Sequence, residues 1–349
     1  MKIDRSGAKQ SQPRTPRIPT ITFFNNKGGV GKTTLVSHLA WMMADLGKNV
    51  LAVDLDPQAN LSAMLLDDDT LEEMLDLDEG DTAKTIAQAL DPILQGTGDV
   101  SDIESTEISS HLRLIVGDLA LSTFEDKLSA AWPLCQNRDP AAFRTMTAFD
   151  RLVQKAAKGW AELILIDVGP NLGAINRSVL ISSDFLILPV GADLFSLRGL
   201  RNLGPSMRAW REVWAELKPK APSGLSLPPG NIEPLGYVVL QHGVRERRSV
   251  KAYQGWVKQF PEAYWEHILG NNPKDFEEED PDPHQLGQLK HYRSLMPMAQ
   301  LANKPMFFLK PADGAIGAHV DAVKKCYQDF KQLAEVILRQ VSAAATQVS

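Results

Sequence analysis

Residues 25–34 read "NNKGGVGKTT" and decide the fold of this chain. The stretch follows the phosphate-loop template G-x-x-x-x-G-K-[ST], except that Asn26 stands where the template has its first glycine. It also contains a second lysine, Lys27, five residues before Lys32. Glycines let the main chain approach a polyphosphate, Lys32 supplies positive charge, and Thr33 offers its hydroxyl to Mg²⁺. The predicted nucleotide contacts in this loop are Gly28, Gly29, Val30, Gly31, Lys32, Thr33 and Thr34.

The sequence on both sides of this loop has the pattern of a βαβ unit. Residues 18–24 are largely β-branched and aromatic, residues 35–46 carry apolar side chains at helical spacing up to Gly47, and residues 50–54 form a second apolar run. The alternative, a glycine-rich turn that binds nothing, is disfavoured by this flanking strand and helix. Further buried strands are predicted at residues 112–116, 163–167, 185–190 and 235–240. The alternation of strands and helices predicts an α/β fold with a doubly wound, mostly parallel sheet and helices on both faces.

Composition limits the classes of function. The chain has 349 residues, 44% of them hydrophobic, with a net charge of −6 and a pI near 5.7. The acidic total argues against a uniformly basic nucleic-acid binder, so any DNA contact must come from a local patch. Cys135 and Cys326 are too few for a zinc cage or a disulfide framework, which indicates a reducing cytoplasm. Because no apolar run reaches the roughly 18 residues of a membrane span, we expect a cytoplasmic protein.

Three aspartates close predicted strands on the same side of the sheet as the loop. Asp54 and Asp56 lie in "VDLDPQAN", and Asp167 ends "LILID". A carboxylate that ends an all-apolar strand is costly to bury without a partner. We therefore favour a metal-linked role over the alternative that each aspartate caps a helix or turn.

Several segments together resemble one family, the deviant Walker A ATPases of the ParA/MinD type, and most of all the ParA-like partition ATPases. The resemblance is carried by "KGGVGKTT", "VDLDPQAN", "LILIDVGPNLGAINRSVL" and "DFLILPVGADLFSLRGL", with "LRLIVGDLALSTFE" and "NKPMFFLKPADGAIGAHV" in support. It extends over most of residues 20–340. The resemblance implies that ATP and Mg²⁺ are the cofactors and that ATP binding produces a homodimer.

The resemblance also implies roles for single residues. Lys27 would be the signature lysine, which in this family reaches the phosphates of the nucleotide held by the other subunit. Asp56 would position or activate the attacking water, and Asp54 would lie close to the metal and to Lys32. Thus Lys27, Lys32 and Asp56 are the implied catalytic residues.

The same comparison implies the metal site and the switch that senses the γ-phosphate. Asp167 would hold Mg²⁺ through water, and the implied metal residues are Thr33, Asp56 and Asp167. Gly169 would lie in switch II and sense the γ-phosphate. The family usually has Asp-x-Pro-Pro here, whereas in this chain Gly169 precedes Pro170, so the sequence of switch II departs from the family pattern while the metal acid is kept.

The remaining site predictions concern the base and DNA. Pro189 and Gln241 lie near the positions where family members touch adenine. Relatives of the ParA type bind nonspecific DNA through basic residues in the C-terminal third, and several basic groups together release counterions from DNA. The predicted DNA contacts are Arg245, Arg247, Arg248, Lys251 and Arg293; the alternative for each is a solvated or salt-bridged side chain.

The resemblance implies a domain organisation. We predict one P-loop ATPase domain over residues 19–342, with insertions at about 62–110 and 255–290. Residues 1–18 are predicted to be a disordered basic tail, either a solubilising leader or an arm that binds DNA or a partner. Residues 343–349 are predicted to be a flexible C-terminal tail.

Three functions remain open at this point. The first is an ATPase that binds DNA as an ATP dimer, is associated with the nucleoid in that state, and is reset by a ParB-like or other stimulating protein during DNA partition or cargo positioning. The second is an ATP-switched regulatory module, for example in a defence or toxin operon, whose dimer captures a protein. The third is a metabolic P-loop ligase. A MinD-like membrane role is disfavoured because only "SAAATQVS" follows Val341, and an iron–sulfur role because the cysteines are not paired.

Overall fold

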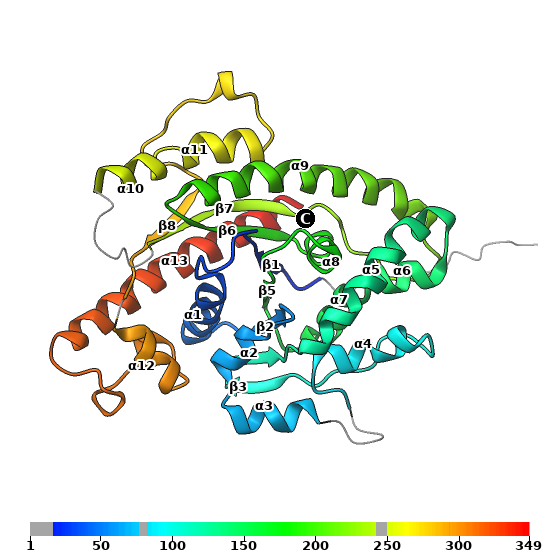
Figure 1. Cartoon of the computed structure of the whole chain (residues 1–349), viewed down its shortest axis with the longest axis horizontal. Helices are drawn as coiled ribbons and strands as arrows, with labels where there is room; N and C mark the ends of the chain where they lie inside the picture. Colours follow the sequence, from blue (N-terminus) through cyan, green and yellow to red (C-terminus); the bar gives the residue numbers. More distant parts are fainter. Residues whose placement is uncertain (1–16, 77–81, 242–249, 293, 349) are drawn as a thin grey trace, which may run out of the picture.

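The computed structural model describes residues 17–76, 82–241, 250–292 and 294–348. In these ranges an eight-stranded sheet has the order β3-β4-β2-β5-β1-β6-β7-β8 (Figure 1). Every neighbouring pair is parallel except β3 and β4. This confirms the predicted fold class. The strands are β1 (Thr20–Phe23), β2 (Val50–Leu55), β3 (Thr106–Ser109), β4 (Leu112–Ile115), β5 (Leu163–Val168), β6 (Phe185–Gly191), β7 (Glu233–Leu240) and β8 (Gln285–Leu289).

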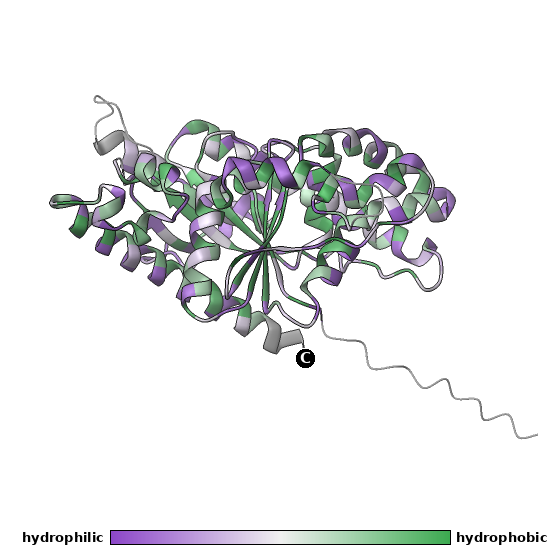
Figure 2. Cartoon of the chain, turned by 90° about the horizontal axis from the view of Figure 1, so that it is seen from below, coloured by the Kyte–Doolittle hydropathy of each residue, from purple (hydrophilic) through white to green (hydrophobic). Residues whose placement is uncertain are grey.

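Helices cover both faces of the sheet, as the edge-on view in Figure 2 shows. The central strands are apolar at nearly every position because successive side chains point into opposite layers. In β2, for example, Leu51 and Val53 lie in the core beneath α4 to α9, whereas Val50 and Ala52 lie in the core beneath α1, α12 and α13. The helices are α1 (Lys32–Asp45), α2 (Asn60–Leu65), α3 (Asp68–Leu75), α4 (Ile86–Gln95), α5 (Ser122–Leu134), α6 (Pro140–Met146), α7 (Ala148–Ala157), α8 (Ala174–Ser182), α9 (Leu194–Leu217), α10 (Val250–Val257), α11 (Phe260–Ala263), α12 (Leu295–Leu301) and α13 (Ala318–Val348).

The strand order brings distant parts of the sequence together at one edge of the sheet. β1 lies between β5 and β6, and β2 lies on the other side of β5. Asp54 pairs in register with Asp167, and Phe23, just before the glycine loop, pairs with the same Asp167. The glycine loop and all three aspartates therefore meet at the carboxyl edge, where open α/β sheets bind ligands.

The two predicted insertions contribute to the main fold. In the first, Ile86 and Leu90 of α4 are buried in the core that covers β2. In the second, predicted at 255–290, residues 285–289 form β8, which pairs in parallel with β7. We missed β8 because its sequence, QLGQL, lacks the apolar run of a strand buried on both faces; it is an edge strand with polar side chains.

The predicted tails need correction at their boundaries. Arg17 and Ile18, which we assigned to the disordered tail, are held in place: the Arg17 guanidinium donates to Asp150 at 2.5 Å and to Asp184 at 3.0 Å, and the Ile18 N–H donates to Gln154. Residues 1–16 lie outside the described residues. At the other end, α13 continues as a helix to Val348, through most of the predicted tail at 343–349. In the part of the chain that the structure describes, no helix is both long and apolar enough to cross a membrane.

Candidate functional site

The glycine loop connects β1 to the first turn of α1. Gly29 and Gly31 have φ values of 70° and 86°, in the left-handed region that side chains with a Cβ rarely adopt. Gly31 is the N-cap of α1, and Lys32 is its first residue. The helix N-terminus thus faces the loop without a side-chain cap, so its N–H groups and partial positive charge are available to an anion.

The residue that departs from the phosphate-loop template packs against α9. A Cβ on Gly199 of α9 would lie 2.5 Å from Oδ1 of Asn26, so the helix approaches the loop closely only because Gly199 has no side chain. The neighbouring Asn25 accepts the Lys27 N–H at 2.9 Å and donates to the Pro189 carbonyl at 2.6 Å. These contacts hold the start of the loop to β6 and α9.

Lys32 is buried and paired with an acid of the same site. Its Nζ donates to Oδ1 of Asp167 at 2.6 Å and to the Val168 carbonyl, and its side chain is only 7% exposed. Thr33 donates its hydroxyl to Oδ2 of Asp167 at 2.7 Å. Burial raises the pKa of the Asp167 carboxyl, while Lys32 and Thr33 counteract this rise. The structure therefore places three predicted site residues in direct contact.

Asp54 has a different environment from the one predicted. Its carboxylate is fully buried and accepts the Ser62 N–H and hydroxyl, each at 2.8 Å, and the Asp56 N–H at 3.2 Å. Burial, followed by the nearby charge of Asp167, raises the pKa of Asp54 to about 7. Asp54 does not line the cavity at the loop. Asp54 therefore organises the segment that carries Asp56, because its oxygens accept from the backbone of that segment; its contact with the nucleotide stays a prediction.

Asp56 lies at the cavity itself and next to switch II. It is 6% exposed, lines the cavity, and accepts the Gln58 N–H at 3.0 Å. A Cβ on Gly169 would lie 3.5 Å from Oδ1 of Asp56. The predicted water-positioning acid and the predicted γ-phosphate sensor are thus neighbours.

A cavity of about 490 Å³ opens above the glycine loop. Besides the loop from Lys27 to Thr34, it is lined by Asp56, Pro170 and residues of α2 and α12, among them Met64, Met296 and Gln300. Thr33, Asp56 and Asp167 offer oxygen ligands of the kind that Mg²⁺ prefers. Among the described residues, no group of three or more His, Cys, Asp or Glu could hold a metal alone. A magnesium ion here would need phosphate and water oxygens to complete its shell.

A smaller, mostly apolar hollow of about 160 Å³ adjoins the loop on the side of β7 and β8. Gln241, one of the two predicted base contacts, lines it. Pro189 lines neither this hollow nor the larger cavity; its carbonyl instead accepts from Asn25. Sequence reasoning missed other walls, because they come from the unrecognised β8, from the segment that follows it and from helices far along the chain: Leu289, Tyr292, Met296, Met306 and Phe330.

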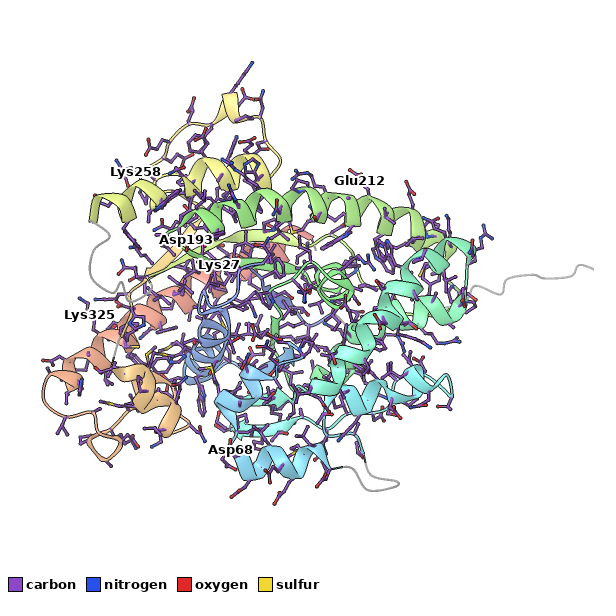
Figure 3. The ribbon with its side chains drawn as sticks, in the orientation of Figure 1. Lys27, Asp68, Asp193, Glu212, Lys258 and Lys325 are labelled. Carbon is purple, nitrogen blue, oxygen red and sulfur yellow. The ribbon has the colours of Figure 1, made fainter. Side chains whose placement is uncertain are left out.

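The second lysine of the loop points to a different partner. Lys27 Nζ donates to Oδ2 of Asp193 at 2.5 Å, and the two side chains are 29% and 15% exposed (Figure 3). Oδ1 of Asp193 accepts the N–H groups of Phe195 and Ser196, so the same carboxylate caps α9. Lys27 is therefore held at the rim of the cavity by its own chain.

The predicted DNA surface falls mostly outside the described residues. Arg245, Arg247, Arg248 and Arg293 are not among them, and Lys251 belongs to α10. The DNA contacts remain predictions from the sequence.

Comparisons with known proteins agree with this geometry. Residues 18–218 match the AAA_31 family, described as an AAA domain. Soj, the sporulation initiation inhibitor protein of Bacillus subtilis, is 30% identical over 188 residues, which cover 54% of this chain and 64% of Soj. The chromosome partitioning protein ParA of Caulobacter vibrioides is 30% identical over 203 residues, which cover 58% of this chain and 66% of ParA. The matched regions thus span slightly less than two thirds of these two relatives.

Solved structures with the same fold include a protein of Corynebacterium diphtheriae and a protein that binds ATP. DIP2308 of C. diphtheriae superimposes with a TM-score of 0.64 at 29% identity, over 82% of this chain and 97% of its own. McdA of Cyanothece, in complex with ATP, superimposes with a TM-score of 0.58 at 15% identity, over 93% of this chain and 97% of its own, which shows the fold alone. With the loop, the aspartates and the sheet in place, the chain belongs to the AAA_31 family, within the ParA/MinD type of P-loop ATPase families.

Proposed function

We propose that this protein is a Mg²⁺-dependent ATPase whose ATP-bound homodimer binds DNA nonspecifically and hydrolyses ATP slowly until a partner stimulates it. Its role would be DNA partition or the positioning of another cargo, with a ParB-like or other protein as the stimulating partner. The observation that carries the proposal is Lys27, a second lysine at the rim of the phosphate cavity whose ammonium pairs with Asp193 and not with the acids of its own site. A lysine in this place would contact the phosphates of the nucleotide that a second subunit binds.

The site residues divide the work of phosphoryl transfer, which is mostly positioning and charge neutralisation. The N–H groups of Gly28 to Thr34 and the ammonium of Lys32 would bind the phosphates, and the hollow next to Gln241 would receive the base. Thr33 and Asp167 would hold Mg²⁺, which neutralises phosphate charge. Asp56 would orient the attacking water.

Nucleotide binding requires a local exchange of partners. Lys32 is engaged with Asp167 and the Val168 carbonyl. An entering phosphate would replace Asp167 as the partner of the Lys32 ammonium. The Asp167 carboxylate would then be available to hold Mg²⁺. Lys32 thus leaves one negatively charged partner for another, which keeps its buried charge compensated throughout.

Purified protein provides the test. ATP should produce a dimer in light scattering and a salt-sensitive shift of nonspecific DNA, because contacts to DNA phosphates weaken steeply with salt. Lys32→Ala should lose both the dimer and the shift, whereas Arg247→Ala combined with Arg248→Ala should lose the shift and keep the dimer. DNA binding that ignores ATP would contradict the proposed cycle.

The second candidate is an ATP-switched module that captures a protein, with DNA contact incidental. It is favoured by two exposed acidic segments: α3, which has no buried residue and carries Asp68, Asp69, Glu72 and Glu73, and residues 277–280 beyond α11. Capture of a protein by the wild type with ATP, retained in the Arg247/Arg248 double variant and lost in Lys32→Ala, would support this candidate over partition.

A further inference from the structure

The loop after β5, residues 169–173, is held from inside the protein by one side chain. We call these residues the switch loop. Asn176 of α8 donates its Nδ2 to the Gly169 carbonyl at 2.7 Å and to the Asn171 carbonyl at 2.5 Å. A longer contact of 3.2 Å joins Nδ2 to Oδ1 of Asn171. The two pinned carbonyls flank Pro170.

The chemistry of this contact requires a carboxamide. Asn176 is 1% exposed, so water does not compensate the Gly169 carbonyl if the contact is lost. Its NH₂ group has two N–H donors, one for each of the two carbonyls. An aspartate of the same size presents acceptors to the two carbonyls, and an alanine presents nothing.

The pinned loop forms a wall of the cavity. Pro170 lines the cavity, and its Cγ lies 3.9 Å from where a Cβ on Gly28 would be. Gly169 lies against the Asp56 carboxylate. Gly169 also lacks the ring that would restrict its φ, so its peptide planes depend on hydrogen bonds for a fixed orientation.

The helix that carries Asn176 is anchored without the switch loop. Glu125 of α5 accepts the N–H groups of Ala174 at 2.5 Å and Ile175 at 2.9 Å, which caps the first turn of α8. Ser178, two residues after Asn176, donates its hydroxyl to the Met146 carbonyl at 2.9 Å. Loss of the Asn176 carboxamide should therefore release the loop and leave the helix in place.

We propose that Asn176 is a positioning residue for ATP hydrolysis: it presets the switch loop so that Gly169 and Asp56 face the γ-phosphate together. This inference rests on the proposed ATPase function. Asn176 touches neither the cavity nor the expected nucleotide, so it acts through the backbone of the loop. It should affect the rate of hydrolysis and leave nucleotide binding in the ground state nearly unchanged.

The test compares Asn176→Asp and Asn176→Ala with Ser178→Ala. Ser178 is fully buried and also bonds to a backbone carbonyl, but on the side away from the site, so its loss is a matched control for stability. We expect kcat to fall about 100-fold in both Asn176 variants, the size of effect that a misplacement of about 1 Å produces. The Kd of a fluorescent ATP analogue should stay within about threefold. Amide exchange of the switch loop should become about tenfold faster, and Ser178→Ala should match the wild type in all three measurements.

Two results would overturn the inference. One is an Asn176→Asp protein that turns over ATP like Ser178→Ala. The other is a loss of nucleotide affinity as large as the loss of kcat, which would indicate a structural role only. If the wild type hydrolyses no ATP even with DNA present, the proposed function fails, and the exchange measurement alone decides the inference: faster exchange confined to the switch loop supports the positioning role, and unchanged exchange refutes it.

Discussion

The two lysines of one ten-residue loop have opposite environments. Lys32 is 7% exposed and donates to a carboxylate that is fully buried, in the middle of the sheet edge. Lys27 is 29% exposed and pairs with Asp193 at the start of α9. Separating the buried pair leaves an uncompensated charge in the core, whereas separating the partly exposed pair costs less because water reaches both groups. The comparison shows that Lys32 belongs to the buried core of the site, whereas the ion pair of Lys27 is the less costly of the two to separate.

The largest effect should come from removing the buried lysine. Lys32→Ala leaves Asp167 buried without its charge partner, and we expect the free energy of unfolding at pH 7 to fall by about 3–5 kcal/mol. Urea denaturation without nucleotide measures this. The double variant Lys32→Ala/Asp167→Asn, which removes the stranded charge, should recover most of the loss. If Lys32→Ala is as stable as the wild type, the buried pair contributes no more to the free energy of unfolding than the pair of Lys27, and the comparison fails.

Removing the partly exposed Lys27 should affect hydrolysis and change the free energy of unfolding little. Lys27→Ala is expected to bind nucleotide within about threefold of the wild type, but to lose ATP-dependent dimer formation and about 10²–10³-fold in hydrolysis, the loss typical for one donor to transition-state charge. Lys48→Ala is the control, because Lys48 forms an exposed ion pair with Glu162 away from the loop. Wild-type ATP turnover in Lys27→Ala would show that Lys27 takes no part in hydrolysis.

The buried His38 of α1, four residues after the end of the loop, should also make stability sensitive to acid. Its Nε2 accepts the Met306 N–H at 3.0 Å, its Nδ1 lies 2.8 Å from the Thr34 carbonyl, and burial lowers the pKa of His38 to about 4. At this histidine the unfolded chain therefore binds more protons between pH 6.5 and 4, and the contribution of His38 to stability falls as the pH falls through that window, by up to about 1.4 kcal/mol per pH unit. The raised pKa of Asp54 acts in the opposite direction, so the contribution of His38 is read from a comparison with a variant that lacks it.

Denaturation at pH 7, 6 and 5 measures this contribution. His38→Gln should be less stable at pH 7 but lose less stability on acidification, whereas a glutamine in place of the exposed His111 should keep the wild-type slope. If the free energy of unfolding depends on pH equally in the wild type and in His38→Gln, His38 does not cause the acid sensitivity.

The smallest effect concerns the ion pair that holds Lys27. Asp193→Asn keeps an oxygen that can cap α9 but removes the charge opposite Lys27. A partly exposed ion pair is worth about 0.2–1 kcal/mol, so dimer formation at limiting ATP should improve by about 2- to 5-fold. Analytical ultracentrifugation over a range of ATP concentrations measures the change. Weaker dimer formation in a stably folded Asp193→Asn protein would show that Asp193 assists the dimer and does not restrain Lys27.

The central sheet was predictable because its signals are local. Residues 50–54 and 163–167 are apolar without interruption and end in aspartates, which is typical of parallel strands covered on both faces. β8 carries no such signal, because one polar edge strand of five residues does not differ from a loop in composition. Missing β8 also hid Leu289 and the residues directly after it, which line one side of the hollow next to Gln241.

The sequence by itself determined the glycine loop, the strand and helix that flank it and the acids at the carboxyl edge, because each has a local pattern along the chain. Only the tertiary structure decided the partners of those groups. Lys27 pairs with Asp193, which lies 166 residues further along the chain. Asn176 donates to the Gly169 carbonyl of the switch loop, which precedes it in the sequence. Asp54 organises the backbone around Asp56 and Ser62, away from the cavity. The physical reason is that hydrogen bonds and ion pairs depend on distances of about 3 Å in space, which the spacing of residues along a chain does not encode.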